Sequence, residues 1–276
     1  MDLAEHLDRM RHIIDRELDR LLPPAKEEPK ALHEAMRYSV FSEGKRLRPI
    51  ITVESCKACG AGANRAYTAA CAIEMVHTYS LIHDDLPAMD DDDMRRGKPA
   101  CHKRFGEASA ILAGDALLTH AMTAISEEYM KPGRAASGLK IIKELSGAIG
   151  SKGMVGGQAM DLDARNGPKP GKQLFEINRL KTAKLFEASS KIGAIAAGAS
   201  DKKVRAMAEY GTGFGMAFQV IDDIIDGESY TDPVSAGRAY RDCLILAEKA
   251  KGAIAGFGKS ARTLMDLFDF VLNRAE

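Results

Sequence analysis

Apolar residues recur every three or four positions along most of the 276-residue chain, the spacing of one face of an α-helix. The first stripe consists of Leu3, Leu7, Met10, Ile14, Leu18 and Leu21. Pro23 and Pro24 then end this segment. The same pattern predicts further helices near residues 30–44, 64–83, 107–130, 133–149, 173–199, 201–226, 236–254 and 260–273. Strict alternation over five or more residues is hard to find, so we expect an all-α fold in one domain spanning residues 1–276.

The composition is that of a globular protein, with 45% hydrophobic and 28% charged residues. Lys+Arg and Asp+Glu both number 39, so no general attraction to nucleic acid or to an anionic membrane is expected. Five cysteines, an odd number, argue against a disulfide framework, and nothing completes a zinc site around Cys56 and Cys59. No apolar run approaches the roughly 20 residues of a membrane span, and the chain opens without a signal peptide. We therefore expect a cytoplasmic protein.

Three glycines, Gly211, Gly213 and Gly215, lie within a helical segment and follow no strand. A dinucleotide-binding loop requires a strand before its glycines. We therefore interpret these three as small residues at close contacts between helices.

A first acidic cluster follows a strongly apolar helix. Asp84 and Asp85 stand at the carboxyl end of this helix, where the helix dipole disfavours negative charge. Pro87 interrupts the helix, so Asp90 is able to fold back toward the pair. His77 lies seven residues before Asp84, nearly two turns along the same face. A histidine on such a helix is either a ligand or a core residue bonded to a backbone carbonyl, and its place on the Asp84 face favours the ligand.

A second acidic cluster forms one stripe of a single helix. Its members, at positions i, i+3, i+4 and i+7, are Gln219, Asp222, Asp223 and Asp226. Carboxylates one turn apart repel each other, and burying them unpaired is costly, so a cation must offset their charge. One such cluster alone is equally well explained by a solvated acidic face or a calcium site. Two clusters on apolar helices favour Mg²⁺, which binds through a few carboxylates together with substrate phosphates.

Basic residues gather at three places. These are the stretch Gly44-Lys45-Arg46-Leu47-Arg48-Pro49, the pair Arg95-Arg96, and the group Arg179, Lys181 and Lys184. Each group alone is explained by surface salt bridges. Together they indicate a pocket for two anionic groups, one held through metal and the other by Lys and Arg directly.

Six motifs, in this order, resemble those of the trans-isoprenyl diphosphate synthases. They are Gly44 to Pro49, the DDxxxxD of Asp84, Asp85 and Asp90, Arg95-Arg96-Gly97, Gly156-Gly157-Gln158, Lys181-Thr182, and the DDxxD of Asp222, Asp223 and Asp226. The stretch from His77 to Gly114 is similar to bacterial short-chain members of the farnesyl diphosphate synthase type. The resemblance covers nearly the whole chain and implies an isoprenoid-synthase helical bundle around a central cavity, in a homodimer.

The resemblance also implies a Mg²⁺-dependent condensation, with three ions when substrate is bound. The metal ligands would be Asp84, Asp85, Asp90, Asp222, Asp223 and Asp226, around an allylic diphosphate, either dimethylallyl or geranyl. Arg95, Lys181 and Gln219 would hold its remaining oxygens, while Thr182 and the carbonyl of Lys181 shield the allylic cation. Isopentenyl diphosphate would be held by Lys45, Arg48, His77 and Arg96. No protein nucleophile is required.

The resemblance also implies that product length depends on bulk just before the first aspartate motif, past which the hydrocarbon tail grows in this family. Tyr79 and Ser80 stand five and four residues ahead of Asp84, and a tyrosine there would close the cavity and favour farnesyl diphosphate. The alternative is that Tyr79 only packs between helices. Geranylgeranyl diphosphate synthase, a terpene cyclase and a non-catalytic partner subunit remain alternative functions.

The chain departs from the family after its second motif. Family members carry a mobile loop there, with GKxxGxD and KxTY stretches whose lysines contact the diphosphate. This chain instead runs from Asp226 through residues 227–233 into the next helix. Either the protein lacks the loop, which would affect turnover, or the sequence omits residues of it. The intact motifs elsewhere favour omission, and an intact mass near 29.9 kDa would contradict it.

Overall fold

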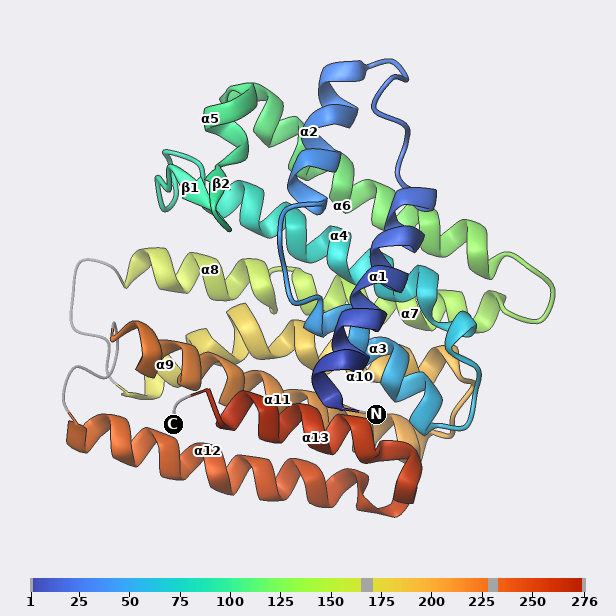
Figure 1. Ribbon diagram of the computed structural model, residues 1–276, viewed down its shortest axis with the longest axis vertical. Coiled ribbons are helices and arrows are strands. Elements are labelled where there is room, and N and C mark those ends of the chain that lie inside the picture. The colour runs from blue at the N-terminus through green and yellow to red at the C-terminus, as the bar shows by residue number, and fades with distance from the viewer. Residues whose placement is uncertain (1, 165–170, 228–232, 275–276) are drawn as a thin grey trace. The chain divides into compact units, whose positions relative to one another are not determined.

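The computed structural model describes residues 2–164, 171–227 and 233–274, and helices dominate this part of the chain (Figure 1). The predicted all-α class is confirmed. The chain divides into two compact units. Unit 1 comprises Met1–Ile50 and Tyr67–Gly138, and unit 2 comprises Ile51–Ala66 and Leu139–Glu276.

Unit 1 is built around a pair of long helices. Its elements are α1 (Leu3–Leu21), α2 (Lys30–Val40), the first turn of α3 (Leu47–Ala58), α4 (Tyr67–Asp84), β1 (Met94–Arg95), β2 (Lys98–Pro99), α5 (Cys101–Phe105) and α6 (Glu107–Tyr129). Helix α4 packs along α6 and also contacts α1 and α2 (Figure 1). Most of α4 is apolar and buried, as expected of a helix covered on all sides. This burial fixes the end of α4, which carries the first aspartates.

A short antiparallel hairpin interrupts the helices of unit 1. Met94 pairs with Pro99 and Arg95 with Lys98, and the two residues between the strands, Arg96 and Gly97, have φ of +53° and +76°. Positive φ at both central residues is typical of a tight hairpin turn. The hydrophobic pattern did not predict this hairpin, because two-residue strands are too short to show alternation.

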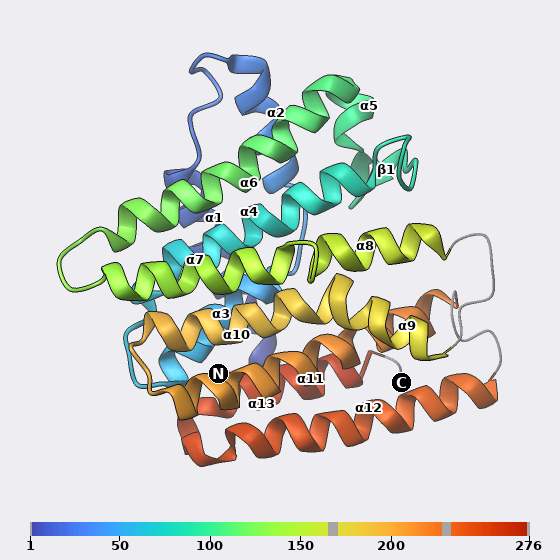
Figure 2. The ribbon, with the colours of Figure 1, turned by 180° about the vertical axis from the view of Figure 1, so that it is seen from behind.

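Unit 2 contains the carboxyl-terminal helices. Its elements are the rest of α3, η1 (Ala63–Arg65), most of α7 (Ala135–Ile149), α8 (Met154–Asp163), α9 (Gly171–Asn178), η2 (Arg179–Ala183), α10 (Lys184–Ala196), α11 (Asp201–Asp226), α12 (Pro233–Ile254), η3 (Ala255–Ala261) and α13 (Arg262–Leu272). Helix α11 contacts α10, α12 and α13. Figure 2 shows α10 and α11 lying side by side.

Glycines on α11 allow this close packing. A Cβ atom at Gly211 would lie 2.6 Å from the carbonyl oxygen of Phe186, and one at Gly215 would lie 2.6 Å from the Cα of Ala183. At Gly213 it would lie 2.8 Å from another Cβ atom on α12. The interpretation of these glycines as helix-contact residues is therefore confirmed.

The predicted helix over residues 173–199 is not continuous in its geometry. The segment consists of α9, the π-helical turn η2 and α10. A π-turn contains one residue more than an α-helical turn, and it leaves both flanking helices in place. The apolar periodicity therefore predicted that the segment is helical, but it did not predict the π-turn within it.

Among the described helices, α6 alone is long and apolar enough to cross a membrane by length and composition. This is a correction to the expectation that no apolar segment approaches such a length. The criterion is also met by core helices of water-soluble proteins, and 39% of its apolar window is buried against the rest of the chain. Part of its apolar surface is therefore exposed.

Candidate active site

The first aspartate cluster (Asp84, Asp85 and Asp90) lies where α4 ends, as predicted. Asp84 is the last residue of the helix, and the backbone N–H of Asp90 donates to the Asp84 carbonyl oxygen at 2.8 Å. The chain thus folds back after Pro87. The Asp85 side chain is buried, whereas Asp90 is exposed.

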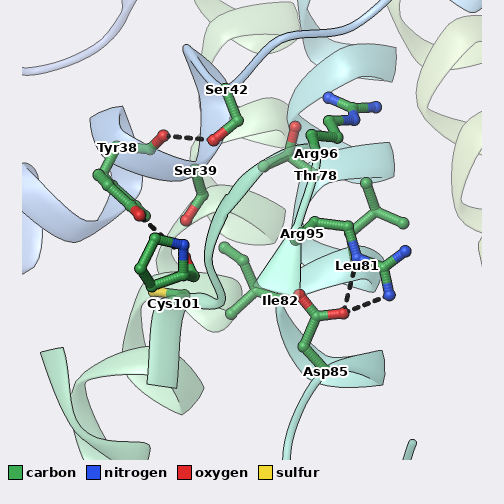
Figure 3. A pocket seen from close by; sticks show the side chains of 11 residues that line it. Tyr38, Ser39, Ser42, Thr78, Leu81, Ile82, Asp85, Arg95, Arg96 and Cys101 are labelled. Carbon is green, nitrogen blue, oxygen red and sulfur yellow. Dashed lines mark hydrogen bonds and ion pairs between the residues drawn. The ribbon is translucent and has the colours of Figure 1, made fainter. Parts of the chain in front are cut away.

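The hairpin supplies a cation for this cluster. Nε and Nη2 of Arg95 donate to Oδ1 of Asp85 at 2.8 and 2.5 Å, as Figure 3 shows. Nη2 also donates to Oδ2 of Asp92 at 2.7 Å. Burial raises the pKa of Asp85, and the hydrogen bond and charge of Arg95 oppose that increase. Arg95 therefore offsets the charge of a carboxylate that the sequence assigned to a metal.

Two arginines converge on one histidine nitrogen. Nη1 of Arg48 lies 3.3 Å from Nε2 of His77, and Nη2 of Arg96 lies 3.4 Å from the same atom. Burial, and then the positive charges of Arg48 and Arg96, lower the pKa of His77 well below its usual value. The imidazole is therefore neutral and able to accept. Like charges this close favour the binding of an anion between them.

The loop before α3 packs against this arginine pair. A Cβ atom at Gly44 would lie only 2.7 Å from Nη1 of Arg96, so the absence of a side chain permits the contact. Lys45 follows Gly44 and is exposed. The hydroxyl of Tyr38 donates to the carbonyl oxygen of Pro99 at 2.8 Å and joins α2 to the hairpin. Lys45, Arg48, His77 and Arg96 thus all belong to unit 1.

A small pocket lies beside the same side chains (Figure 3). Its volume of about 20 Å³ accommodates a single water-sized molecule. Ser39, Thr78, Arg95 and Arg96 are among the residues that line it. Among the described residues, the buried hydroxyl of Thr78 has no hydrogen-bond partner. The pocket is suited to a water and is too small for a diphosphate.

Tyr79 and Ser80 lie on α4 just before the first aspartate cluster. The Tyr79 side chain is 5% exposed, and its ring meets that of His83 edge-on with centroids 5.7 Å apart. Burial, aided by the charge of Asp84, raises the pKa of Tyr79 to about 12. The hydroxyl of Ser80 donates to the carbonyl oxygen of His77 at 2.8 Å. A role for either residue in product length remains a prediction.

The second aspartate cluster (Asp222, Asp223 and Asp226) lies on the last turns of α11, with Gln219 one turn earlier. The buried carboxylate of Asp223 accepts hydrogen bonds from Nε2 of Gln219 at 2.7 Å and from Nδ2 of Asn178 at 3.1 Å. Oε1 of Gln219 in turn accepts from the hydroxyl of Thr182 at 2.6 Å. Three predicted residues are therefore joined in one network.

The other two carboxylates of the second cluster have more open surroundings. Asp222 forms an ion pair of 2.8 Å with Arg274, whose guanidinium also lies 5.5 Å from the ring centroid of Phe218. Asp226 is the last residue of α11 and is exposed. Sequence reasoning missed Asn178 and Arg274, because neither has a motif spacing that connects it to the aspartates.

Lys181 and Thr182 lie in the π-turn η2. Nζ of Lys181 donates to Oδ2 of Asp161 on α8 at 2.9 Å. Gly157 lets α8 approach this turn, since a Cβ atom there would lie 2.3 Å from the backbone nitrogen of Lys181. The next residue, Gln158, is buried, and neither atom of its amide has a hydrogen-bond partner among the described residues. The GGQ motif therefore has a packing role that the sequence did not predict.

The two clusters offer carboxylate oxygens, the ligand type that Mg²⁺ prefers. Within the described part of the chain, no three His, Cys, Asp or Glu side chains are grouped as a metal site made by protein alone. Mg²⁺ commonly binds one or two carboxylates together with substrate phosphates. Asp85 and Asp222 are carboxylates already paired with a cation. Any Mg²⁺ ion bound at the clusters would therefore need further ligands from substrate phosphates or water.

These features define a helical protein with two aspartate clusters and, in unit 1, a pair of arginines beside a buried histidine. Residues 29–243 match the polyprenyl synthetase family model, and the chain belongs to this family. It is 39% identical over 272 residues to the farnesyl diphosphate synthase of Escherichia coli (strain K12), covering 98% of this chain and 90% of that protein. It is 43% identical over 237 residues to geranylgeranyl pyrophosphate synthase 12, chloroplastic, of Arabidopsis thaliana, covering 84% of this chain.

Solved structures agree with this assignment. The apo structure of an FPP/GFPP synthase from Zymomonas mobilis superposes with a TM-score of 0.90 at 35% identity, over 98% of both chains. A geranyltransferase from Legionella pneumophila gives 0.90 at 33% identity, over 99% of this chain and 97% of that one. The predicted isoprenoid-synthase helical bundle and the family resemblance are confirmed.

The match to plant relatives covers less of their length. It spans 64% of the Arabidopsis protein named above and 61% of a heterodimeric geranylgeranyl pyrophosphate synthase large subunit. Residues 228–232, where the family loop was expected, lie outside the described residues, so the interpretation of that loop remains a prediction.

Proposed function

We propose that this protein is a trans-prenyltransferase that condenses isopentenyl diphosphate with an allylic diphosphate and releases pyrophosphate. The observation that carries the proposal is the convergence of Arg48 and Arg96 on Nε2 of His77. This anion site is distinct in composition from the aspartate clusters. A terpene cyclase binds one diphosphate and would have no use for a second site of this kind.

The allylic diphosphate is proposed to bind at the two aspartate clusters. The residues that would hold Mg²⁺ are Asp84, Asp85, Asp90, Asp222, Asp223 and Asp226. When bound, Mg²⁺ neutralises the charge of the diphosphate and makes it a better leaving group. Arg95 and Lys181 donate hydrogen bonds to its oxygens, and the amide of Gln219 orients the network around it.

The polar groups near η2 are proposed to shield the allylic cation. The hydroxyl of Thr182 and the carbonyl oxygen of Lys181 present partial negative charge. Because Thr182 already donates its proton to Gln219, its oxygen lone pairs are available to face a cation. This arrangement would lower the free energy of the cation without forming a covalent bond.

Isopentenyl diphosphate is proposed to bind at the arginine pair. Lys45, Arg48 and Arg96 donate to its diphosphate, and neutral His77 accepts from both guanidiniums and keeps them in place. The double bond then attacks the allylic cation, and the proton that is lost passes to the released pyrophosphate. No Ser, Cys or Lys nucleophile takes part.

Farnesyl diphosphate is the proposed product. Two bacterial relatives carry that name, at 43% and 39% identity, and buried Tyr79 stands before the first aspartate cluster. Geranylgeranyl diphosphate is the second candidate, because several plant relatives of 37–46% identity are named for it. The size of the Tyr79 side chain is proposed to decide between the two products.

We also propose a cytoplasmic homodimer that associates through the exposed part of α6. Ile111 and Leu112 on this helix are 45% and 58% exposed. Apolar surface on a protein often marks an interaction site when it forms a contiguous patch, and these two neighbouring side chains are where we place the interface.

The test of this function is incubation of the purified chain with labelled isopentenyl diphosphate, Mg²⁺ and either dimethylallyl or geranyl diphosphate, followed by product sizing. We expect label in a fifteen-carbon product, and none when Mg²⁺ is removed by a chelator. Products formed from the allylic diphosphate alone would instead identify a cyclase. Absence of any product from the purified chain would contradict the proposal and would favour a non-catalytic partner subunit.

A further inference from the structure

Arg46 stands between two proposed diphosphate ligands and points into the protein. Its side chain is 2% exposed, whereas Lys45 is exposed and Arg48 reaches His77. Nε of Arg46 donates to Oδ1 of Asp15 at 2.9 Å, and Nη1 donates to Oε1 of Glu74 at 2.7 Å. All three nitrogens of the guanidinium are therefore used, since Nη2 donates to a carbonyl oxygen at the end of α2 at 2.6 Å.

The backbone of Arg46 requires this anchoring. Its φ is +50°, in the left-handed region, which is unfavourable for any residue with a side chain. The preceding segment leaves α2 and the following one begins α3, so Arg46 sets the direction in which the chain enters α3. Its guanidinium contacts α1, the end of α2, and α4, and these contacts hold the unfavourable backbone conformation.

The buried ion pair is also adjacent to the anion site. Glu74 is three residues before His77 on α4, one turn away on the same side of the helix. The Glu74 side chain is 2% exposed and pairs with Arg46. Nε2 of the same histidine lies 3.3 Å from Nη1 of Arg48 and 3.4 Å from Nη2 of Arg96. The buried ion pair of Arg46 thus lies one helical turn from the histidine that both arginines contact.

We propose that Arg46 is a positioning residue: it does not touch the diphosphate, but it fixes the loop so that Lys45 and Arg48 reach isopentenyl diphosphate. This inference rests on the proposed function. A positioning role of Arg46 differs from a purely stabilising role in one respect. A buried ion pair that only stabilises the fold is often replaceable by apolar side chains of similar volume, and its loss has no selective effect on one substrate. A positioning residue replaced in that way leaves a folded protein with a misplaced loop.

The test is the double variant Arg46→Met with Glu74→Leu in the full chain. We expect a folded protein with a lower melting temperature, because the carbonyl oxygen at the end of α2 loses its donor. We also expect a KM for isopentenyl diphosphate raised about tenfold or more and a KM for the allylic diphosphate changed by less than about twofold. The control is Lys191→Met with Glu144→Leu, which removes a partly buried ion pair between α10 and α7 in unit 2. It should change neither KM.

Two milder variants keep the inference testable if the double variant does not fold. Arg46→Lys retains the charge but loses the planar fork, and Asp15→Asn removes the charge of the most exposed partner. Both should raise the KM for isopentenyl diphosphate by about threefold or more and leave the other KM unchanged. An equal rise in both KM values, or no rise in a folded variant, would overturn the positioning role.

Calorimetric titration with isopentenyl diphosphate separates this inference from the proposed function. If the wild-type chain forms no product, the proposed function fails, but binding is still measurable. We then expect the folded Arg46 variants to bind isopentenyl diphosphate about tenfold more weakly than the wild type. Equal binding by wild type and variants would reject the role of Arg46 whatever the outcome of the activity assay.

Discussion

His77 shows how a single side chain sets the chemistry of its surroundings. Burial and the charges of Arg48 and Arg96 lower its pKa, so the ring is uncharged at neutral pH, with its Nε2 3.3 and 3.4 Å from the two guanidiniums. Protonation would turn the ring into a third positive charge. The neutral histidine therefore adds no positive charge beside the two arginines.

The stability of the protein should depend on the charge of His77. Its folded pKa lies below the unfolded value of about 6.5, so the unfolded chain binds more protons as the pH falls through that value. The contribution of neutral His77 to the free energy of unfolding should therefore be complete above about pH 6.5 and should decrease as the pH falls below that value. We expect the free energy of unfolding, measured by urea denaturation, to fall more steeply from about pH 7 to 5.5 in the wild type than in His77→Gln. Equal slopes would contradict the neutral histidine.

The size of Tyr79 should determine product length. Replacing the buried ring in Tyr79→Ala opens space before the first aspartate cluster, and we expect most of the product to exceed fifteen carbons. Tyr79→Phe keeps the volume and should leave the product unchanged. Chromatographic sizing of the labelled products measures both. If Tyr79→Ala still gives only the wild-type product, Tyr79 does no more than pack between helices.

Motif residues were predictable from the sequence because their spacing reflects a shared helix or turn. Gln219, Asp222 and Asp223 follow helical spacing, and the structure places them on one helix. Their partners do not follow such a rule. Asn178 lies 45 residues before Asp223, and its amide meets that carboxylate only through the packing of helices in unit 2. Hydrogen bonds between distant segments leave no local pattern.

At the scale of elements, the change of winding at η2 is the feature most closely connected to the proposed chemistry. The π-turn includes Lys181 and Thr182, and Gly157 of α8 contacts its backbone. π-Turns occur often at functional sites, because the extra residue alters the direction of nearby side chains. The close approach of α8 to this turn therefore requires a residue without a side chain at position 157, which is Gly157.

Adding that side chain should be costly. In Gly157→Ala the new Cβ would lie 2.3 Å from a backbone nitrogen, which cannot move as a flexible side chain would. We expect a loss of about 1–3 kcal/mol in unfolding free energy by urea denaturation, together with a lower kcat. Gly147→Ala on α7 is the matched control, since no atom lies within 4 Å of its added Cβ. That variant should be neutral or more stable by up to about 1 kcal/mol. A Gly157→Ala protein as stable as wild type would show that the contact is unimportant.

Helices with strong periodicity were predicted well. The expected segments 3–21 and 201–226 coincide with α1 and α11. Helix α8 was missed because Gly156 and Gly157 reduce its helix propensity by about 1 kcal/mol each and interrupt its apolar pattern. The hairpin was missed because its strands are short. Tertiary packing, which local pattern does not contain, determines these elements.

At the scale of the whole molecule, association should depend on the exposed face of α6. Leu112 is 58% exposed on a helix with a long apolar window. A charge there would have to be buried in the proposed interface, so Leu112→Glu should shift the protein from dimer toward monomer. Light scattering after size-exclusion chromatography measures the mass. Leu244→Glu on α12, where the leucine is 41% exposed, is the control and should remain dimeric. A wild-type protein that is monomeric would contradict the proposed interface.

The proposed chemistry requires that both aspartate clusters act on one diphosphate. The direct measurement is a crystal structure of the protein with Mg²⁺ and an allylic diphosphate analogue whose carbon–oxygen bond cannot break. We predict metal ions bound to a single diphosphate, with ligands from both Asp84 and Asp222. A diphosphate held by only one cluster, with the other cluster too distant to share its metal ions, would contradict the proposed function.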